Sequence, residues 1–408
     1  MKEAIDAYQA KSKISLCTEE QRNKALLAIS DALLKHQNEI INQNELDLEQ
    51  AKKMNLSSAM IDRLKLDSDR IQTMASSVKN IAKQDQVVGE VTQRLKRADG
   101  LIITKERTPI GVIGMIFESR PNVVIDSSAL AIKSGNCIIL KGGKEAANSN
   151  EILFEIIRDA ITPHLAPSCI QMLFNRSDVS ELLKQTSYVD LIIPRGGEGL
   201  IQYVCENSKV PVLAHFKGLC HVFIDESANL SDALEMAINA KTHRTGVCNA
   251  METLLIHKSI KKDFLIKLFK KFSDHKTKLR LSEELYNQFP QYEKADKLDW
   301  DTEYLENILS VRLVNDIQEA LTHIQKHGSH HTEAIFSENE DNIDLFKRAV
   351  DASSIMVNAS TRFNDGGEYG LGAELGISTS KIHAYGPMGA KEMTIERFVV
   401  YGKGHIRK

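Results

Sequence analysis

The feature that most constrains this chain is a regular alternation of short apolar runs with amphipathic segments between residues 112 and 224. The apolar runs are as long as buried strands, and the segments between them have helical length and periodicity. Strands that alternate with helices in this way form a parallel, doubly wound sheet. The predicted strands are Val112–Phe117, Cys137–Leu140, Ile170–Phe174, Val189–Ile193, Val210–Leu213 and His221–Ile224. The predicted helices are Val124–Lys133, Glu145–Ile161, Val179–Gln185 and Glu198–Asn207.

A second α/β unit is expected from residue 231 onward, where strands and helices alternate again. Ser231 is expected to cap the first helix of this unit, at residues 232–240. The other predicted strands are 253–257, 311–314, 334–336 and 354–357, and the other predicted helices are 260–274, 317–327 and 342–350. The polar stretch 277–300 is expected to be an irregular surface excursion, and the glycine-rich stretch 359–391 a functional loop.

The segments that flank these two units have patterns of their own. Residues 15–85 are predicted to form a helical layer on a sheet, and Thr18 to Gln21 fits a capping box. Residues 100–105 and 394–401 have the pattern of exposed strands, which tend to pair with other strands. We therefore expect at least a dimer, assembled through strand pairing between about residues 97–106 and 394–402.

The composition limits the class of protein. A chain of 408 residues is expected to hold two or three domains, and 42% hydrophobic with 26% charged residues is typical of globular proteins. A net charge of -3 argues against nucleic acid or an anionic membrane as a partner. The apolar runs are too short to span a bilayer and the N-terminus lacks an apolar signal core, so a cytoplasmic protein is expected. The scattered cysteines predict free thiols and no metal site.

Cys248 is the first candidate for a catalytic residue. It lies in a polar turn between a predicted helix and a predicted strand, where a thiol is positioned by the fold. The basic neighbours Lys241, His243 and Arg244 favour the thiolate, which is the nucleophilic form of cysteine. The alternative interpretation is a small buried hydrophobic residue, the usual role of a single cysteine.

Two glycine pairs, Gly142-Gly143 and Gly196-Gly197, each follow a predicted strand and precede a predicted helix. Such positions lie at the carboxyl edge of a parallel sheet, where ligands bind. Glycines at this edge let backbone N–H groups approach phosphate oxygens. A tight turn without a ligand would explain the same two pairs.

Four motifs resemble the gamma-glutamyl phosphate reductases, a family within the aldehyde dehydrogenase superfamily. They are Glu118-Ser119-Arg120-Pro121-Asn122-Val123, Leu140-Lys141-Gly142-Gly143-Lys144-Glu145-Ala146, Pro194-Arg195-Gly196-Gly197, and Val247-Cys248-Asn249-Ala250 with Glu252-Thr253-Leu254-Leu255. The resemblance extends from about Ala4 to Gly404. It implies an α/β fold of the aldehyde dehydrogenase kind, with two doubly wound domains and a small β oligomerisation element. The implied boundaries are 1–95 and 110–228 for an NADP-binding domain, 229–375 for a catalytic domain, and 96–109 with 392–408 for oligomerisation strands.

The resemblance also implies a reaction, the NADPH-dependent reduction of L-glutamyl 5-phosphate to L-glutamate 5-semialdehyde and phosphate in proline biosynthesis. Cys248 would attack the acyl phosphate and form a thioacyl intermediate, which hydride then reduces. Asn122 and the backbone N–H of Cys248 would stabilise the oxyanion. A turn residue that follows Pro121 is the alternative interpretation of Asn122.

The substrate-binding residues that the resemblance implies are Arg120, His215, Arg244, Arg362 and Glu368. Arg120 would hold the phosphoryl or carboxylate group, Arg362 the α-carboxylate, and Glu368 the α-amino group. His215 stands where hydrolytic aldehyde dehydrogenases carry a water-activating glutamate. The loss of that carboxylate fits an enzyme whose thioacyl intermediate reacts with hydride or phosphate and not with water. A histidine packed against its neighbours is an equal alternative interpretation of His215.

The cofactor-binding residues that the resemblance implies are Lys141, Gly142, Gly143, Lys144, Arg195, Gly196, Gly197 and Glu303. Lys141 resembles a lysine that binds the adenosine ribose, and Glu303 a glutamate that binds the nicotinamide ribose. Lys144 stands where many NAD-dependent relatives carry a ribose-binding carboxylate. A cation at this place favours the 2′-phosphate, so NADP(H) is the expected cofactor.

Two other functions are alternatives to the reduction of an acyl phosphate. An irreversible oxidation of an aldehyde to an acid is disfavoured because the water-activating glutamate is missing. A catalytically silent scaffold protein is disfavoured because Cys248, Asn122, Lys141 and both glycine pairs are present. Contact with a glutamate 5-kinase, which would supply the labile acyl phosphate, is a further expectation about partners.

Overall fold

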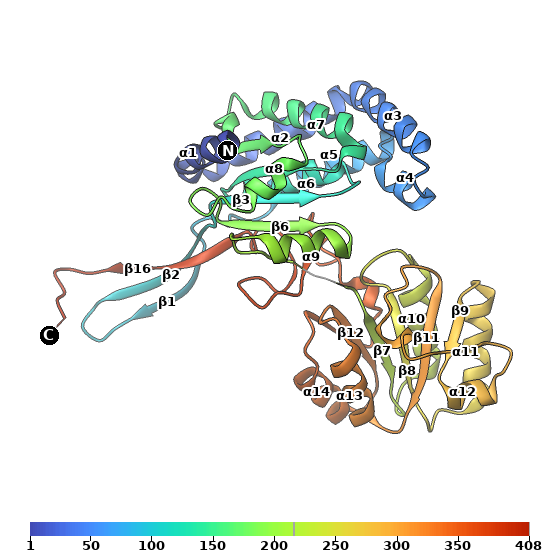
Figure 1. Ribbon diagram of the computed structural model, residues 1–408. Coiled ribbons are helices and arrows are strands. Elements are labelled where there is room, and N and C mark those ends of the chain that lie inside the picture. Colours follow the sequence, from blue (N-terminus) through green and yellow to red (C-terminus); the bar gives the residue numbers. More distant parts are fainter. Residues whose placement is uncertain (215–216, 408) are drawn as a thin grey trace.

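Two α/β bodies and a projecting arm make up the molecule (Figure 1). The structure is a computed structural model that describes residues 1–214 and 217–407. Each body is built on a parallel sheet, and the arm is a separate antiparallel sheet. The predicted α/β class, with two doubly wound domains and a small β element, is confirmed.

The sheet of the first domain has the strand order β5-β4-β3-β6, with all neighbours parallel. Its strands are β3 (Val112–Phe117), β4 (Cys137–Lys141), β5 (Ile170–Met172) and β6 (Leu191–Arg195). Residues 210–213 were predicted as a further strand, but only Val212 forms a bridge, to Ile192. Pro211 explains this difference, because a proline has no N–H to extend the ladder.

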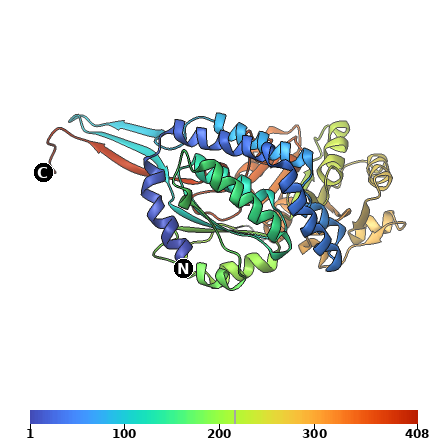
Figure 2. The same cartoon turned by 90° about the horizontal axis from the view of Figure 1, so that it is seen from above.

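Helices cover both faces of this sheet, and an N-terminal helical layer lies over one of them (Figure 2). They are α1 (Lys2–Leu16), α2 (Glu19–Lys35), α3 (Gln37–Lys53), α4 (Ser58–Leu64), α5 (Ser68–Lys83), α6 (Asn122–Lys133), α7 (Ala147–Ile161), α8 (Ser177–Leu182) and α9 (Glu198–Asn207). Short 3-10 turns lie at η1 (Lys144–Ala146) and η2 (Pro167–Cys169). The capping box is confirmed: the Thr18 hydroxyl accepts from the Gln21 N–H, and the Gln21 side chain accepts from the Thr18 N–H.

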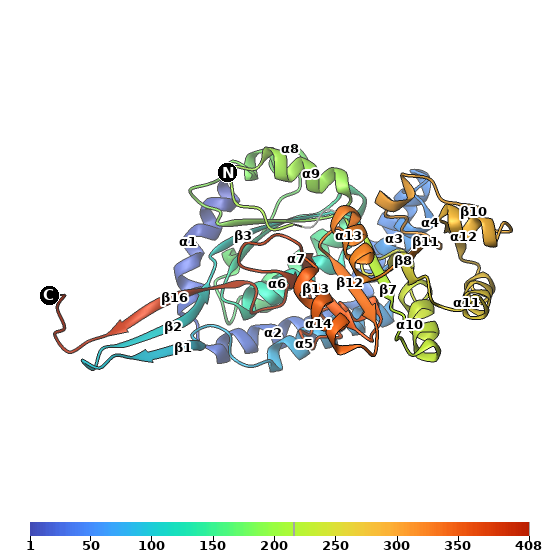
Figure 3. The same ribbon diagram turned by 90° about the horizontal axis from the view of Figure 1, so that it is seen from below.

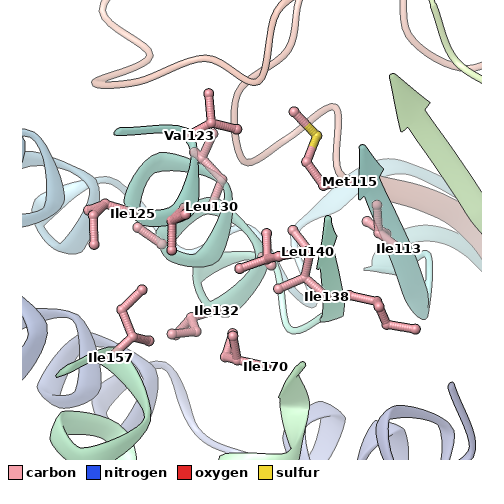
Figure 4. Close-up of a cluster of buried hydrophobic side chains, with 14 of the residues drawn as sticks. Ile113, Met115, Val123, Ile125, Leu130, Ile132, Ile138, Leu140, Ile157 and Ile170 are labelled. Carbon is pink, nitrogen blue, oxygen red and sulfur yellow. The ribbon is translucent and has the colours of Figure 1, made fainter. Parts of the chain in front are cut away.

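Aliphatic side chains fill the space between sheet and helices. Figure 4 shows Ile113 and Met115 of β3 and Ile138 and Leu140 of β4 in one cluster with Leu130 of α6. All five are completely buried. Both faces of β3 and β4 are therefore covered, which is why these strands consist of continuous apolar runs.

The sheet of the second domain has the order β10-β9-β11-β8-β7-β12-β13 and is also parallel. Its strands are β7 (Cys220–Ile224), β8 (Met251–His257), β9 (Lys278–Leu281), β10 (Glu293–Lys294), β11 (Ile308–Val314), β12 (Thr332–Phe336) and β13 (Ser354–Val357). Its helices are α10 (Leu230–Thr242), α11 (Lys262–Asp274), α12 (Glu283–Gln288), α13 (Ile317–His327) and α14 (Glu340–Ala349), with 3-10 turns at η3 (Asp299–Asp301) and η4 (Thr361–Phe363).

Three expectations about this domain were wrong. Strand β7 lies between β8 and β12, so the second sheet begins at Cys220 and not after residue 228. The stretch 277–300 contributes β9 and β10 to the sheet edge, because apolar Leu279 and Leu281 are buried there. Helix α10 is capped by Asn229, whose side chain accepts from the N–H groups of Ser231 and Asp232.

The arm consists of β1 (Val91–Lys96), β2 (Ile102–Pro109) and β16 (Thr394–Tyr401), in the order β1-β2-β16. All of its strand pairs are antiparallel. The expected pairing of the hairpin with the C-terminal tail therefore occurs inside one chain. Among the described residues, no further strand pairs with the outer edges of β1 and β16. Figure 3 shows that the arm extends away from both domains.

The polypeptide returns from the second domain to the first before it enters the arm. This return segment contains a small antiparallel pair, β14 (Ile377–Ser378) with β15 (Gly386–Pro387). Leu375, Met388 and Met393 join the hydrophobic core of the first domain. Within the described ranges, no helix has the length and apolar character needed to cross a membrane.

A buried lysine joins the N-terminal helical layer to α6. Lys133 is completely buried and donates to the Glu19 carboxylate and to Gln84 O at 2.7 Å. Lys133→Met should lower the free energy of unfolding by about 2–3 kcal/mol, because it removes the donor of Gln84 O and leaves Glu19 with Arg22 as its ion-pair partner. Urea unfolding followed by circular dichroism would measure the loss.

Lys24→Met is the matched control, since Lys24 forms an exposed i,i+4 pair with Glu20. Exposed pairs of this kind contribute little, so the urea midpoint should stay near that of the parent protein. Equal midpoints for both variants would contradict a linking role of Lys133.

Candidate active site

Cys248 lies in the loop between α10 and β8, where three contacts hold the backbone. The Cys220 thiol donates to Cys248 O at 3.2 Å. Gly218 packs so closely that a Cβ there would lie 2.1 Å from the same oxygen. The following residue, Asn249, is buried and donates from Nδ2 to Asn364 O at 2.9 Å. The position of the thiol is therefore fixed by its surroundings, as covalent chemistry requires.

A buried ion pair closes the base of this loop. Lys241 Nζ at the end of α10 donates to the Glu252 carboxylate on β8 at 2.6 Å, and their side chains are 0% and 1% exposed. The second Glu252 oxygen accepts from the Leu305 N–H at 3.2 Å. The pair thus ties the Cys248 loop to the segment that carries Glu303. The ammonium of Lys241, which was expected to favour the thiolate, is bound to Glu252 instead.

Cys248 opens into a cavity of about 680 Å³ that residues of both domains line. The first domain contributes the segments after β3 and β6, at the carboxyl edge of its sheet. The second domain contributes the Cys248 loop and the segment around Glu303. The predicted site residues that this Cys248 cavity brings together are Arg120, Arg195, Gly196, Gly197, Arg244, Cys248, Glu303 and Arg362.

The wall of the Cys248 cavity carries several arginines as well as carboxylates such as Glu303 and Glu374. The arginines that line it among the described residues are Arg63, Arg120, Arg195, Arg244 and Arg362. Burial, together with the cations Arg195, Arg63 and Arg244, lowers the pKa of Arg120 to about 10. Because crowded cations destabilise one another, the part of the cavity around Arg120 favours an anion.

The electrostatic surroundings of the Cys248 thiol are mixed. Burial raises the pKa of the thiol, and the Glu374 and Glu303 carboxylates add to this effect. Arg195 and Arg120 act in the opposite direction. The cations that would bind an anionic substrate therefore also favour the thiolate.

Asn122 lies beside the Cys248 cavity rather than on its wall. Its Nδ2 donates to the Asp126 carboxylate at 2.8 Å, one turn further along α6. It lines a small adjacent cavity of about 40 Å³ together with Arg120, Arg195 and Glu374. The predicted oxyanion role of Asn122 stays a prediction, and it requires the amide to exchange Asp126 for the substrate.

The predicted cofactor residues lie along the carboxyl edge of the first sheet. In register, Lys141 faces Ile116 and Arg195 faces Phe117, so the two basic residues flank the end of β3. With neighbouring strands about 4.8 Å apart, their backbones are separated by about 10 Å. Lys141 Nζ donates to Gly142 O at 2.6 Å, and the following Lys144 is exposed.

The N-terminus of α9 has the character of an anion site. The Gly197 N–H donates to the Glu118 carboxylate at 2.8 Å, so an anionic oxygen already lies there. Helix N-termini bind phosphate for the same reason, since their N–H groups and the helix dipole favour negative charge. These residues therefore fit the diphosphate of a dinucleotide, which would replace the Glu118 carboxylate.

The Cys248 cavity also has lining residues that were not assigned a role from the sequence. Ser119, Arg63 and Glu374 all line it. Glu368, the residue expected to bind the α-amino group, is exposed and is not part of this wall. Both glutamates lie in the same glycine-rich stretch, so spacing alone could not choose between them. His215 lies outside the described residues.

Comparisons with known proteins agree with this geometry. Residues 1–287 match the model of the aldehyde dehydrogenase family. The gamma-glutamyl phosphate reductase of Nitratiruptor sp. is 50% identical over 391 residues, which are 95% of each chain. That of Geobacter metallireducens is 47% identical and covers 99% of this chain and 98% of its own. The crystal structure of gamma-glutamyl phosphate reductase from Thermotoga maritima has a TM-score of 0.97 at 41% identity, over 100% of this chain and 99% of its own.

The chain therefore belongs to the aldehyde dehydrogenase family and, within it, to the gamma-glutamyl phosphate reductases. The resemblance inferred from the four motifs is confirmed. The six cysteines are free in the structure, and Cys248 is the one on the wall of the Cys248 cavity.

The close contact at Gly218 leads to a prediction about the nucleophile. In Gly218→Ala the new Cβ would lie 2.1 Å from Cys248 O and 2.6 Å from its Cα, so the Cys248 loop must move. A displacement of about 1 Å at a reacting atom costs on the order of a hundredfold in rate. We expect a loss of this size in kcat and in the rate at which iodoacetamide labels Cys248.

Gly199→Ala is the matched control. Gly199 lies in α9, and a Cβ there meets nothing within 4 Å. This variant should keep full activity and gain stability of about 0.5–1 kcal/mol, because alanine is the better helix former. Normal labelling of Cys248 in Gly218→Ala would show that the contact does not set the position of the thiol.

Proposed function

We propose that this chain reduces L-glutamyl 5-phosphate with NADPH to L-glutamate 5-semialdehyde and phosphate, the second step of proline biosynthesis from glutamate. The observation that carries the proposal is a thiol, Cys248, that opens into a cavity lined by arginines at the edge of a doubly wound sheet. An acyl phosphate needs both a nucleophile for its carbonyl carbon and cations for its phosphate. The names of the close relatives support the same reaction.

Cys248 is the nucleophile in this proposal. Its sulfur forms a bond to the acyl carbon, and the carbon–oxygen bond to phosphate breaks, so phosphate leaves with the electron pair. Arg120 and Arg244 on the cavity wall neutralise the leaving phosphate. A bound NADPH would supply the hydride that the acyl carbon receives, and Cys248 would then leave as a thiolate when the carbon–sulfur bond breaks.

Residues of the first domain would hold the NADPH. Lys141 binds the adenosine ribose, Lys144 the 2′-phosphate, and the glycine pairs together with the N-terminus of α9 bind the diphosphate. Arg195 lies beside this path, and Glu303 reaches the nicotinamide ribose from the second domain. Glu303 accepts the Gly218 N–H at 3.0 Å, which keeps it close to the Cys248 loop.

The proposal also includes the cellular location, the oligomeric state and a partner protein. The chain acts in the cytoplasm and forms a dimer or larger homo-oligomer through the outer edges of the arm. Large apolar side chains of the arm, Leu95, Phe398 and Val400, are more than half exposed, which supports a contact with another copy. A glutamate 5-kinase that hands over the acyl phosphate is the expected further partner.

The reaction is best tested in reverse. The enzyme should oxidise L-glutamate 5-semialdehyde with NADP only when inorganic phosphate is present, since phosphate must release the acyl group from Cys248. Cys248→Ala should abolish turnover while NADPH binding, measured by fluorescence, changes little. Phosphate-independent oxidation would indicate a hydrolytic aldehyde dehydrogenase, and an active Cys248→Ala variant would exclude the covalent route.

The choice of cofactor is tested at Lys144. Lys144→Glu should lower kcat/KM for NADPH by about ten- to a hundredfold, because a charge-assisted bond to the 2′-phosphate is worth roughly 1.5–3 kcal/mol. NADH, which lacks this phosphate, should lose little or gain. Lys141→Ala is the matched comparison and should weaken both cofactors. Equal losses for both in Lys144→Glu would show that this lysine does not read the phosphate.

A further inference from the structure

Glu374 is a carboxylate in the active site to which the reaction as described gives no role. It precedes β14 in the return segment and lines the Cys248 cavity and the small cavity beside Asn122. It also lines a third cavity of about 550 Å³, which shares Arg120, Arg195 and Arg244 with the Cys248 cavity. Glu374 therefore lines all three of these neighbouring cavities.

The backbone holds this carboxylate but leaves part of it available. One oxygen, Oε2, accepts from the Gly366 N–H at 2.8 Å. The other, Oε1, lies 4.0 Å from Arg195 Nη2, which is too long for a hydrogen bond. Gly366 makes the approach possible, since a Cβ there would lie 2.6 Å from Glu374 Cβ. One oxygen is thus held by the backbone, and the other has Arg195 at ion-pair distance but no hydrogen bond to it.

The surroundings of Glu374 favour the arrival of a positive charge. Burial raises the pKa of its carboxyl, Asp365 adds to the shift, and Arg195 opposes it. Asp126 lies in the same two neighbouring cavities, and burial raises the pKa of its carboxyl to about 6. Carboxylates whose charge is incompletely compensated bind a cation strongly.

Anionic and cationic groups lie together around this space. Arg63, Arg120 and Arg244 line the same third cavity as Asp126 and Glu374. An α-amino acid offers the matching pair, a carboxylate for arginine and an ammonium for the acidic side chains. The α-nitrogen of a glutamyl group lies about 5 Å from its reacting carbon, given bonds of about 1.5 Å. Glu374 raises the pKa of the Cys248 thiol, so it lies within electrostatic range of the reacting atoms.

We propose that Glu374, supported by Asp126, binds the α-ammonium of the glutamyl substrate and so makes the enzyme specific for an α-amino acid. This inference rests on the proposed function, since it names the part of that substrate which Glu374 recognises. It replaces the assignment of the α-amino group to the exposed Glu368. The competing explanation is a structural role, in which Glu374 only holds the loop at Gly366.

Two aldehydes separate these explanations: L-glutamate 5-semialdehyde and 5-oxopentanoate, which has the same length and carboxylate but no amino group. Both are oxidised with NADP and phosphate by the parent enzyme and by Glu374→Gln, which keeps the size of the side chain and an acceptor for Gly366. We expect kcat/KM for the amino substrate to fall ten- to a hundredfold, with little loss or a gain for 5-oxopentanoate. Equal losses for both substrates, or no loss for either, would overturn the proposal.

Two further variants show whether the loss in Glu374→Gln comes from the missing carboxylate or from a general loss of activity. Glu368→Gln should leave both substrates unchanged, because this side chain is exposed and lies off the cavity wall. Asp126→Asn should repeat the selective loss to a smaller extent, and it serves as the second test if Glu374→Gln does not fold.

A labelling experiment separates this inference from the proposed function. L-glutamate should protect Cys248 from iodoacetamide better than glutarate does in the parent protein, and Glu374→Gln should abolish that difference. A parent enzyme without phosphate-dependent oxidation would contradict the proposed function, while the difference in protection would still support recognition of the ammonium. Equal protection by glutamate and glutarate in the parent protein would contradict the inference about Glu374 but not the proposed function.

Discussion

The contact between the backbones of Gly218 and Cys248 is the constraint on which the active site depends. Gly218 belongs to the connection between the two sheets, after the bridge of Val212 to β6 and before β7. Gly218 therefore lies directly against the Cys248 loop, and its N–H also binds Glu303. Any side chain at position 218 would collide with the backbone of Cys248, so the loop that carries the thiol would have to move.

The electrostatics of the site combine rigid support with an incompletely balanced cavity. Lys241 and Glu252 are fully desolvated, and such a pair contributes little net stability. It does fix both ends of the Cys248 loop and the segment that carries Glu303, which an apolar pair could not do through hydrogen bonds. The arginines of the cavity, in contrast, crowd one another and lower the pKa of Arg120. The supporting pair is compensated internally, whereas a bound anion would offset the repulsion among Arg120 and its neighbouring arginines.

The return of the chain from the second domain explains how distant residues reach one site. Residues after β13 pass through the Arg362 turn, deliver Glu374 to the cavity and then join the core of the first domain at Leu375 and Met388. The same path ends in β16, which completes the arm. Substrate recognition, the packing of the first domain and the arm therefore depend on one continuous segment.

The sequence by itself determined many of the helices and strands and the site residues that lie in motifs of consecutive residues. The strand Val112–Phe117, the helix Ile317–His327 and the C-terminal strand were predicted with the bounds that the structure has, because apolar periodicity reports which face of an element is buried. The motif around Cys248 identified the family, and the resemblance with its motifs pointed to Arg120, Arg195, Arg244, Glu303 and Arg362, all of which lie on one cavity.

Only the tertiary structure decided which sheet β7 joins, that the arm pairs within the chain, and which polar groups face the cavity. An apolar run is the same signal in either sheet, so periodicity could not assign residues 220–224. Asn122 lies two residues after Arg120 in the sequence but donates to Asp126, because one turn of α6 brings the side chains of Asn122 and Asp126 together. Glu374 differs from Glu368 through the bond to Gly366 and the packing of Leu375, contacts that arise only when the chain has folded back on the first domain.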